Sequence, residues 1–74
     1  MVESLGEKVQ RLRHRRGWSQ RELARLARLS QPVVSALERG VRKDTTGRTL
    51  VRLAFALETS VDYLLGRMDH EPLP

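Results

Sequence analysis

Helix start signals recur along this whole sequence and constrain its fold more than any other feature. Ser4 and Ser19 are each followed by a glutamate three residues later. This is the spacing of a capping box, in which the serine and glutamate side chains each accept a backbone N–H. Further N-cap residues are Ser30, Thr46 and Ser60, whose hydroxyls suit the free amides of a first helical turn. No stretch alternates apolar and polar residues over a useful length, so the chain is predicted to be all-α.

These signals predict five short helices. The expected elements are a first helix capped by Ser4 and ended by Gly17, a second over about 20–27, a third between Ser30 and Gly40, a fourth after Thr46 and a fifth over Val61–Leu65. Pro32 falls in the first turn of the third helix, where a missing N–H costs nothing. We therefore expect a compact five-helix domain over residues 1–66 and a short C-terminal tail over residues 67–74.

Length and composition exclude several classes of protein. The 74 residues include no cysteine, so helix packing must stabilise the domain without a disulfide or a thiolate zinc site. So small a domain has no room for a large cofactor, and we expect neither a cofactor nor a small-molecule ligand. No run is long and apolar enough for a membrane span or a signal-peptide core, which predicts a cytoplasmic protein without a membrane partner.

The charge is distributed unevenly along the chain. Residues 1–57 hold 13 of the 14 lysines and arginines and 5 of the 9 acidic residues, a net charge of +8, whereas residues 58–74 have a net charge of −3. Most of the cations are arginines, whose planar guanidinium binds phosphate and guanine edges through paired hydrogen bonds. The asymmetry favours one basic surface that binds a polyanion, with a generic solvated surface as the alternative.

Candidate catalytic residues are few. His14 and His70 are far apart in the sequence, and neither has a Cys, Asp or Glu at metal-ligand spacing on a shared helical face. Four of the serines, Ser4, Ser19, Ser30 and Ser60, are accounted for as helix caps, and the sequence has no glycine-rich phosphate loop. We expect neither an enzyme nor a metal site.

The second and third helices are joined by a tight turn, the arrangement with which a helix enters the major groove of DNA. Their segment, 19–40, reads SQRELARLARLSQPVVSALERG. It closely resembles the helix-turn-helix of the lambda-repressor and Cro-like family, the Xre group. The matching residues are Ser19, Gln20, Glu22, Leu23, Ala24, Ser30, Val34, Leu37, Glu38, Arg39 and Gly40. The likeness extends over about residues 5–66 and implies a lambda-repressor-like fold that binds DNA.

The exposed face of the third helix is the expected site of base readout. Gln31 carries both a donor and an acceptor and suits a bidentate contact to adenine, whereas Pro32, Val33 and Ala36 can meet only apolar surface such as thymine methyls. For Val33, a place in the core is an open alternative.

Phosphate contacts are expected around the same helix. The candidates are Gln20, Ser30, Ser35, Arg39, Arg42 and Lys43. Gln20 and Ser30 stand at helix amino ends, where free amides and the helix dipole favour a phosphate, and simple capping is the alternative. The resemblance implies a backbone-contacting role for the loop of Arg39, Arg42 and Lys43, with a merely solvated cation as the alternative for each.

The resemblance also implies a salt bridge between Arg13 of the first helix and Glu38 of the third. The sequence departs from the family pattern at Arg28 and Glu58, where glycine is usual, and its loop after Gly40 is one residue longer. A residue other than glycine at positive φ costs about 1–2 kcal/mol.

One such domain covers few base pairs, so we expect a homodimer on a palindromic operator. The expected interface is the fifth helix and its surroundings, with Phe55, Val61, Tyr63 and Met68. Alternatively, Phe55 or Tyr63 covers the small core.

These features favour a sequence-specific regulator of transcription, a repressor or autoregulator that binds double-stranded DNA. One alternative is an antitoxin-type regulator that also binds a toxin. Another is a protein-interaction module that uses the same fold without reading DNA, which acidic residues on the third helix would have favoured. The expected exposed face of that helix has none.

Overall fold

The computed structural model describes residues 3–41, 45–68 and 70–71. Within them the chain forms five helices and no strand, as predicted. The helices are α1 (Leu5–Arg15), α2 (Gln20–Ala27), α3 (Gln31–Glu38), α4 (Gly47–Ala56) and α5 (Val61–Leu64). The last helix ends one residue before the expected Leu65, which is its C-cap.

Local hydrogen bonds set the helix boundaries. The capping boxes are complete, because Ser4 and Ser19 accept the N–H of Glu7 and Glu22 while their own N–H groups donate to those carboxylates. The hydrogen bond from the Ser19 N–H lowers the pKa of Glu22. The glycines expected after α1, α3 and α5 all have positive φ, which stops each helix without strain.

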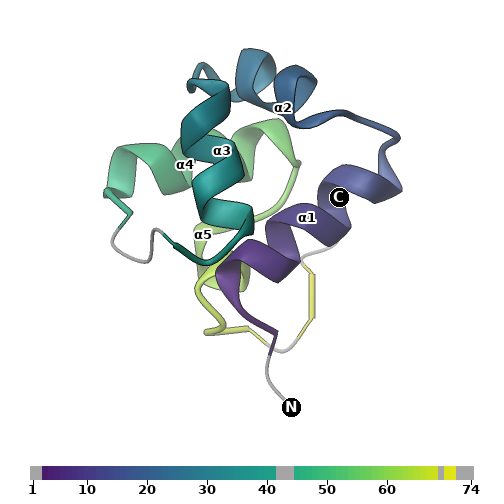
Figure 1. The fold of residues 1–74 in the computed structure, drawn as a ribbon. Coiled ribbons are helices and arrows are strands. Elements are labelled where there is room, and N and C mark those ends of the chain that lie inside the picture. Colours follow the sequence, from purple (N-terminus) through teal and green to yellow (C-terminus); the bar gives the residue numbers. More distant parts are fainter. Residues whose placement is uncertain (1–2, 42–44, 69, 72–74) are drawn as a thin grey trace.

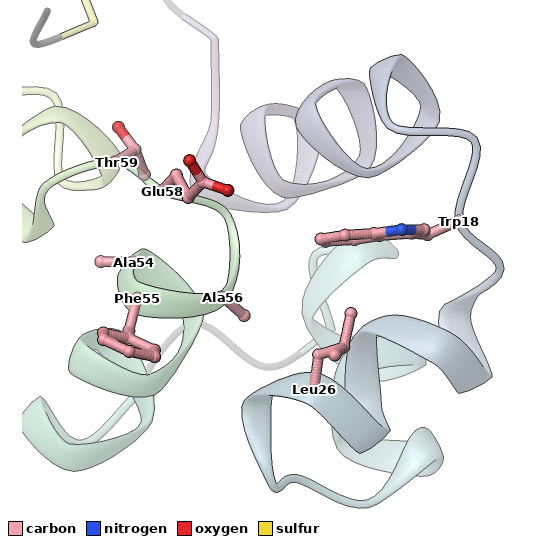
Figure 2. Close-up of a pocket in the computed structure, with 7 residues that line it drawn as sticks. All are labelled: Trp18, Leu26, Ala54, Phe55, Ala56, Glu58 and Thr59. Carbon is pink, nitrogen blue, oxygen red and sulfur yellow. The ribbon is translucent and has the colours of Figure 1, made fainter. Parts of the chain in front are cut away.

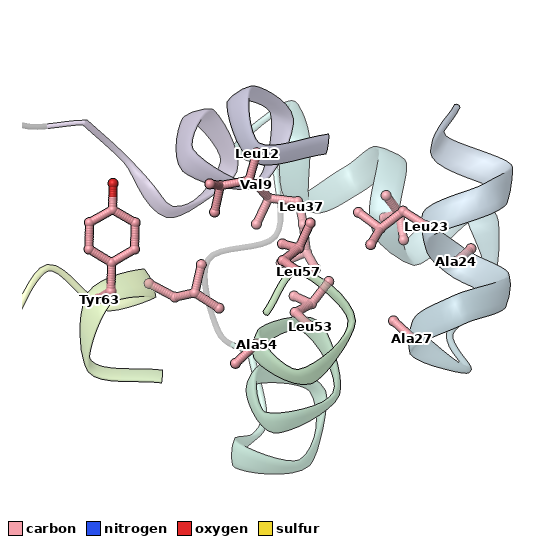
Figure 3. Close-up of a cluster of buried hydrophobic side chains, with 12 residues drawn as sticks. Val9, Leu12, Leu23, Ala24, Ala27, Leu37, Leu53, Ala54, Leu57 and Tyr63 are labelled. Atoms are coloured by element: carbon pink, nitrogen blue, oxygen red, sulfur yellow. The ribbon is translucent and has the colours of Figure 1, made fainter. Parts of the chain in front are cut away.

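The helices pack as a closed ring around one core. Helix α3 packs against α1 and α2, α4 packs against α2, and α5 lies between α4 and α1 (Figure 1). Leucines and alanines from all these elements converge in the middle (Figure 3). The core consists of Val9, Leu12, Leu23, Ala24, Ala27, Val34, Leu37, Leu53, Ala54, Leu57, Tyr63 and Leu64. This ring holds α3 with one face outward.

Gly6 permits the closest approach in this ring. A Cβ at Gly6 would lie 2.2 Å from the carbonyl oxygen of Leu37, so α1 and α3 can cross here only with a hydrogen in that place. Its signal in the sequence was a glycine inside a helix, where the residue costs about 1 kcal/mol relative to alanine.

Candidate nucleic-acid interface

A strained turn connects α2 to α3. Arg28 adopts the left-handed conformation, with φ 57° and ψ 44°, at the position where the family usually has glycine. The N–H of Leu29 then reaches back to the carbonyl of Ala24 at 2.8 Å, which satisfies the end of α2. Glu58 adopts a similar positive φ after α4. Both residues therefore adopt the left-handed backbone that glycine favours and accept the strain of a side chain there.

The first turn of α3 carries the most accessible candidates for base contacts. Gln31 and Pro32 are exposed, whereas Val33 and Ala36 are half-buried. Val33 packs against the edge of the core cluster, so the alternative we left open for it holds in part. The opposite face of α3 is buried through Val34 and Leu37. Helix α3 thus offers one amide side chain beside small apolar groups.

The candidates for phosphate contacts are spread around both ends of α3. Ser30 is exposed at the amino end, where its hydroxyl accepts the N–H of Val33 at 3.4 Å. Ser35 is half-buried, and exposed Arg39 donates from Nε to the Ser35 carbonyl at 3.4 Å. Gln20 at the start of α2 is half-buried. Arg42 and Lys43 lie outside the described residues.

Arg13 and Glu38 form the ion pair that the resemblance implied. The guanidinium Nε and Nη2 donate to the two carboxylate oxygens at 2.7 and 2.8 Å, and the two side chains are only 9% and 3% exposed. The bond to Glu38 raises the pKa of Arg13. Two more bonds extend the network, from Arg13 Nη1 to the Trp18 carbonyl at 2.7 Å and from Gln20 Nε2 to Glu38 Oε1 at 3.1 Å. The pair therefore ties α1, the start of α2 and the end of α3 together.

The four residues expected at a dimer interface do not form one exposed patch. Tyr63 is buried in the core cluster, which agrees with the alternative that it covers the core, and two cations of α1 contact it. Lys8 Nζ donates to its carbonyl at 2.9 Å, and Arg11 Nη2 donates to its hydroxyl at 2.6 Å. Val61 and Met68 are half-buried against the core. Of the four, Phe55 alone is strongly exposed, at 84%.

The segment after α5 folds back on the domain. Met68 packs on the core cluster, and Glu71 accepts a salt bridge from Arg15 of α1 at 2.5 Å. This bond lowers the pKa of Glu71. Two residues of the tail expected after residue 66 thus contact the domain, Met68 at the core and Glu71 at α1.

The two histidines do not form a metal site in the part of the chain that the structure describes. His14 and His70 are exposed, and the described residues contain no group of three or more His, Cys, Asp or Glu placed to hold a metal ion. None of the helices in the described ranges has the length and apolar character that a membrane crossing requires.

Comparisons with known proteins agree with this geometry. A family model described as helix-turn-helix matches residues 9–64. The P22 c2 repressor, solved with a synthetic operator, is 30% identical over 86% of this chain and 96% of that chain, with a TM-score of 0.81. The restriction-modification controller protein C.AhdI from Aeromonas hydrophila is 33% identical over 82% and 91%, with a TM-score of 0.76. The N-terminal DNA binding domain of SinR from Bacillus subtilis is 25% identical over 85% and 91%, with a TM-score of 0.80. No curated protein matches the chain.

Proposed function

Since this chain belongs to the helix-turn-helix family, we propose that it regulates transcription by binding a specific double-stranded DNA sequence. The observation that carries this proposal is the exposed first turn of α3, where Gln31 and Pro32 project from a helix whose other face is buried. A helix of this kind enters the major groove by its amino end. The similarity to a repressor solved with its operator supports the same use.

Readout combines one hydrogen-bonding side chain with apolar contacts. Gln31 pairs with adenine N6 and N7, while Pro32 and Ala36 meet thymine methyl groups and Val33 contributes its exposed part. Ser30, Gln20, Ser35 and Arg39, with Arg42 and Lys43 in the following loop, position the domain on phosphates. Because so few side chains read bases directly, DNA shape supplies part of the specificity.

The regulator acts as a homodimer on a palindromic operator. Two copies related by a two-fold axis place their α3 helices in successive major grooves, about 34–36 Å apart. The interface comprises α5 and its flanks, in the acidic part of the chain. There Leu65 is 42% exposed beside half-buried Val61 and Met68. Tyr63 supports this surface from inside, and Phe55 is not part of it.

Selection of bound sequences from a pool of random duplexes tests the proposal. A palindromic consensus should emerge, and affinity for it should fall with salt by about 0.9 log units per neutralised phosphate for each log unit of salt. A scrambled duplex of equal length is the control. Enrichment of no sequence, or an affinity that does not change with salt, would reject DNA binding.

Sedimentation on the operator-free protein tests the interface separately. Leu65→Glu should yield a folded monomer if α5 forms the dimer surface, because a buried unpaired carboxylate is costly there. A parent protein that stays monomeric at high concentration contradicts the homodimer in free solution.

A further inference from the structure

Three large apolar side chains lie exposed on one face of the molecule. Leu26 of α2 is 42% exposed, and Val51 and Phe55 of α4 are 59% and 84% exposed. Single exposed apolar side chains are ordinary, but a cluster of them with a polar border indicates an interaction site. None of the candidate base-contacting residues of α3 belongs to this cluster.

The cluster borders a groove between α2 and α4. One part, of about 610 Å³, is lined by Trp18, Leu26, Ala54, Phe55, Ala56, Glu58 and Thr59. An adjoining part, of about 320 Å³, is lined by Leu26, Ala27, Arg28, Val51, Arg52 and Phe55. Because Leu26 and Phe55 line both parts, the two parts form one continuous groove, called here the α2–α4 groove. Figure 2 shows Trp18 and Leu26 on one wall and Phe55 and Ala56 on the other.

Cations predominate at the rim of the α2–α4 groove. At one end Arg52 Nη1 donates to the carbonyl of Arg28 at 3.3 Å. At the other end the Arg16 guanidinium lies 5.3 Å from the centre of the Trp18 ring and forms a long salt bridge, 3.3 Å, with Glu58. The groove and its rim thus hold three arginines, Arg16, Arg28 and Arg52, and one carboxylate, that of Glu58. The contacts orient two of these arginines, which reduces the entropy lost when a partner binds.

We propose that the α2–α4 groove binds a short amphipathic helix of another protein, with apolar side chains along one face and acidic residues beside them. The apolar side chains would lie on Leu26 and Phe55, and the acidic ones would reach Arg28 and Arg52. Since two helices form the walls, a third helix can pack the apolar residues at its positions i, i+3, i+4 and i+7 between them. A second copy of the chain would bring the same cations to the contact, which is unfavourable. None of the candidate base-contacting residues of α3 lines the groove, so base readout does not account for the exposure of Phe55.

Trp18 makes the proposal directly testable, because it is the only tryptophan of the chain and lines the groove. Two synthetic helical peptides serve as probes. Both carry Leu and Phe at i, i+3, i+4 and i+7, and they differ in having either Glu or Lys at the flanking positions. The Glu peptide should shift the Trp18 emission in a saturable way and bind about tenfold tighter or more than the Lys peptide. Equal affinities, or no saturable shift with the Glu peptide, would overturn the proposal.

Two leucines of equal exposure provide the matched variants. Leu26 lines the groove and Leu65 does not, yet both are 42% exposed. Leu26→Glu should abolish binding of the Glu peptide, whereas Leu65→Glu should leave it unchanged, with circular dichroism reporting the fold of each. Phe55→Glu, at a site 84% exposed, repeats the test where folding cannot suffer. Peptide binding that survives Leu26→Glu and Phe55→Glu rejects the site.

The same variants distinguish the other occupants. If Leu26→Glu rather than Leu65→Glu converts a dimer to a monomer in sedimentation, the groove binds a second copy and the proposal is wrong. If operator DNA displaces the Glu peptide from the parent protein, the rim contacts DNA and the assignment to a protein partner is also wrong. Peptide binding does not depend on an operator, so the failure of the proposed function leaves this result unaffected.

Discussion

The outer face of α3 and the α2–α4 groove are two surfaces of the same small domain, and their exposed side chains differ in kind. The face of α3 presents Gln31 and Pro32 above small half-buried groups, whereas the groove presents Leu26 and Phe55 between arginines. Recognition of base edges requires hydrogen-bond donors and acceptors on a helix that fits the major groove, while binding of a partner helix requires an apolar surface. The contrast teaches that α2 contributes to both surfaces in different ways: it packs against α3 behind the exposed first turn of that helix, and its Leu26 lines the groove.

The largest effect should come from a change that damages the support common to both surfaces. Glu38→Ala leaves the guanidinium of Arg13 without its partner in a nearly buried place and should lower the free energy of unfolding by about 3–5 kcal/mol. Chemical denaturation measures this. The control is Glu71→Ala, which breaks the more exposed pair with Arg15 and should cost about 0–1 kcal/mol. Similar losses in the free energy of unfolding for the two variants would show that the Arg13–Glu38 pair does not stabilise the packing of the helices.

A second change acts on the crossing of α1 and α3. Gly6→Ala places a Cβ against the backbone of Leu37 and should destabilise the fold by about 1–3 kcal/mol through overpacking. Gly47→Ala is the matched control, because Gly47 also lies in a first helical turn and a Cβ there meets nothing within 4 Å. It should be neutral or stabilise by up to about 1 kcal/mol. Thermal melts of equal midpoint would contradict the close approach.

A third change separates the two surfaces. Gln31→Ala should remove about 1–3 kcal/mol of discrimination at one base pair of each half-site while leaving binding of the Glu peptide intact. Binding to a panel of single-base operator variants measures the first effect. The exposed Gln10 of α1 gives the control Gln10→Ala, which should change neither. An equal loss on every operator variant would make Gln31 a phosphate contact instead.

The smallest effect concerns the turn between the surfaces. Arg28→Gly removes a side chain from a residue at φ 57°, which should stabilise the fold by about 1–2 kcal/mol. Glycine also has a greater backbone entropy in the unfolded chain, which should destabilise the fold by about 0.5–1 kcal/mol. We expect a net stabilisation of about 1 kcal/mol or less and weaker binding of the Glu peptide. Arg25→Gly, inside α2, should instead destabilise by about 1 kcal/mol. A drop in operator affinity for Arg28→Gly would assign Arg28 to the DNA surface.

The helix-turn-helix frame was largely predictable from the sequence. The serine caps and the glycines after α1, α3 and α5 stand where the helices begin and stop, and the family resemblance supplied the pairing of Arg13 with Glu38. The unusual turn residue Arg28 was also recognised as a departure, and the structure shows that the turn keeps its left-handed form despite it.

The surface for partners was not predictable in the same way. Phe55 and Tyr63 are both aromatic residues near the end of the chain, yet one is exposed and the other is buried. Helix α5 has only four residues, too few for an apolar period to reveal which side faces inward. No local signal distinguished Leu26 from the three core positions of α2, which are Leu23, Ala24 and Ala27.

The sequence alone determined where the helices start and end, because capping bonds join residues three positions apart and require no tertiary contact. Only the tertiary structure decided which side chains remain outside. Tyr63 is buried because α5 packs against α1, where Lys8 and Arg11, more than 50 residues away in the chain, bind its carbonyl and its hydroxyl. Leu26 and Phe55 share a groove because α4 packs on α2. Such pairings depend on how the ring of helices closes, which no local pattern encodes.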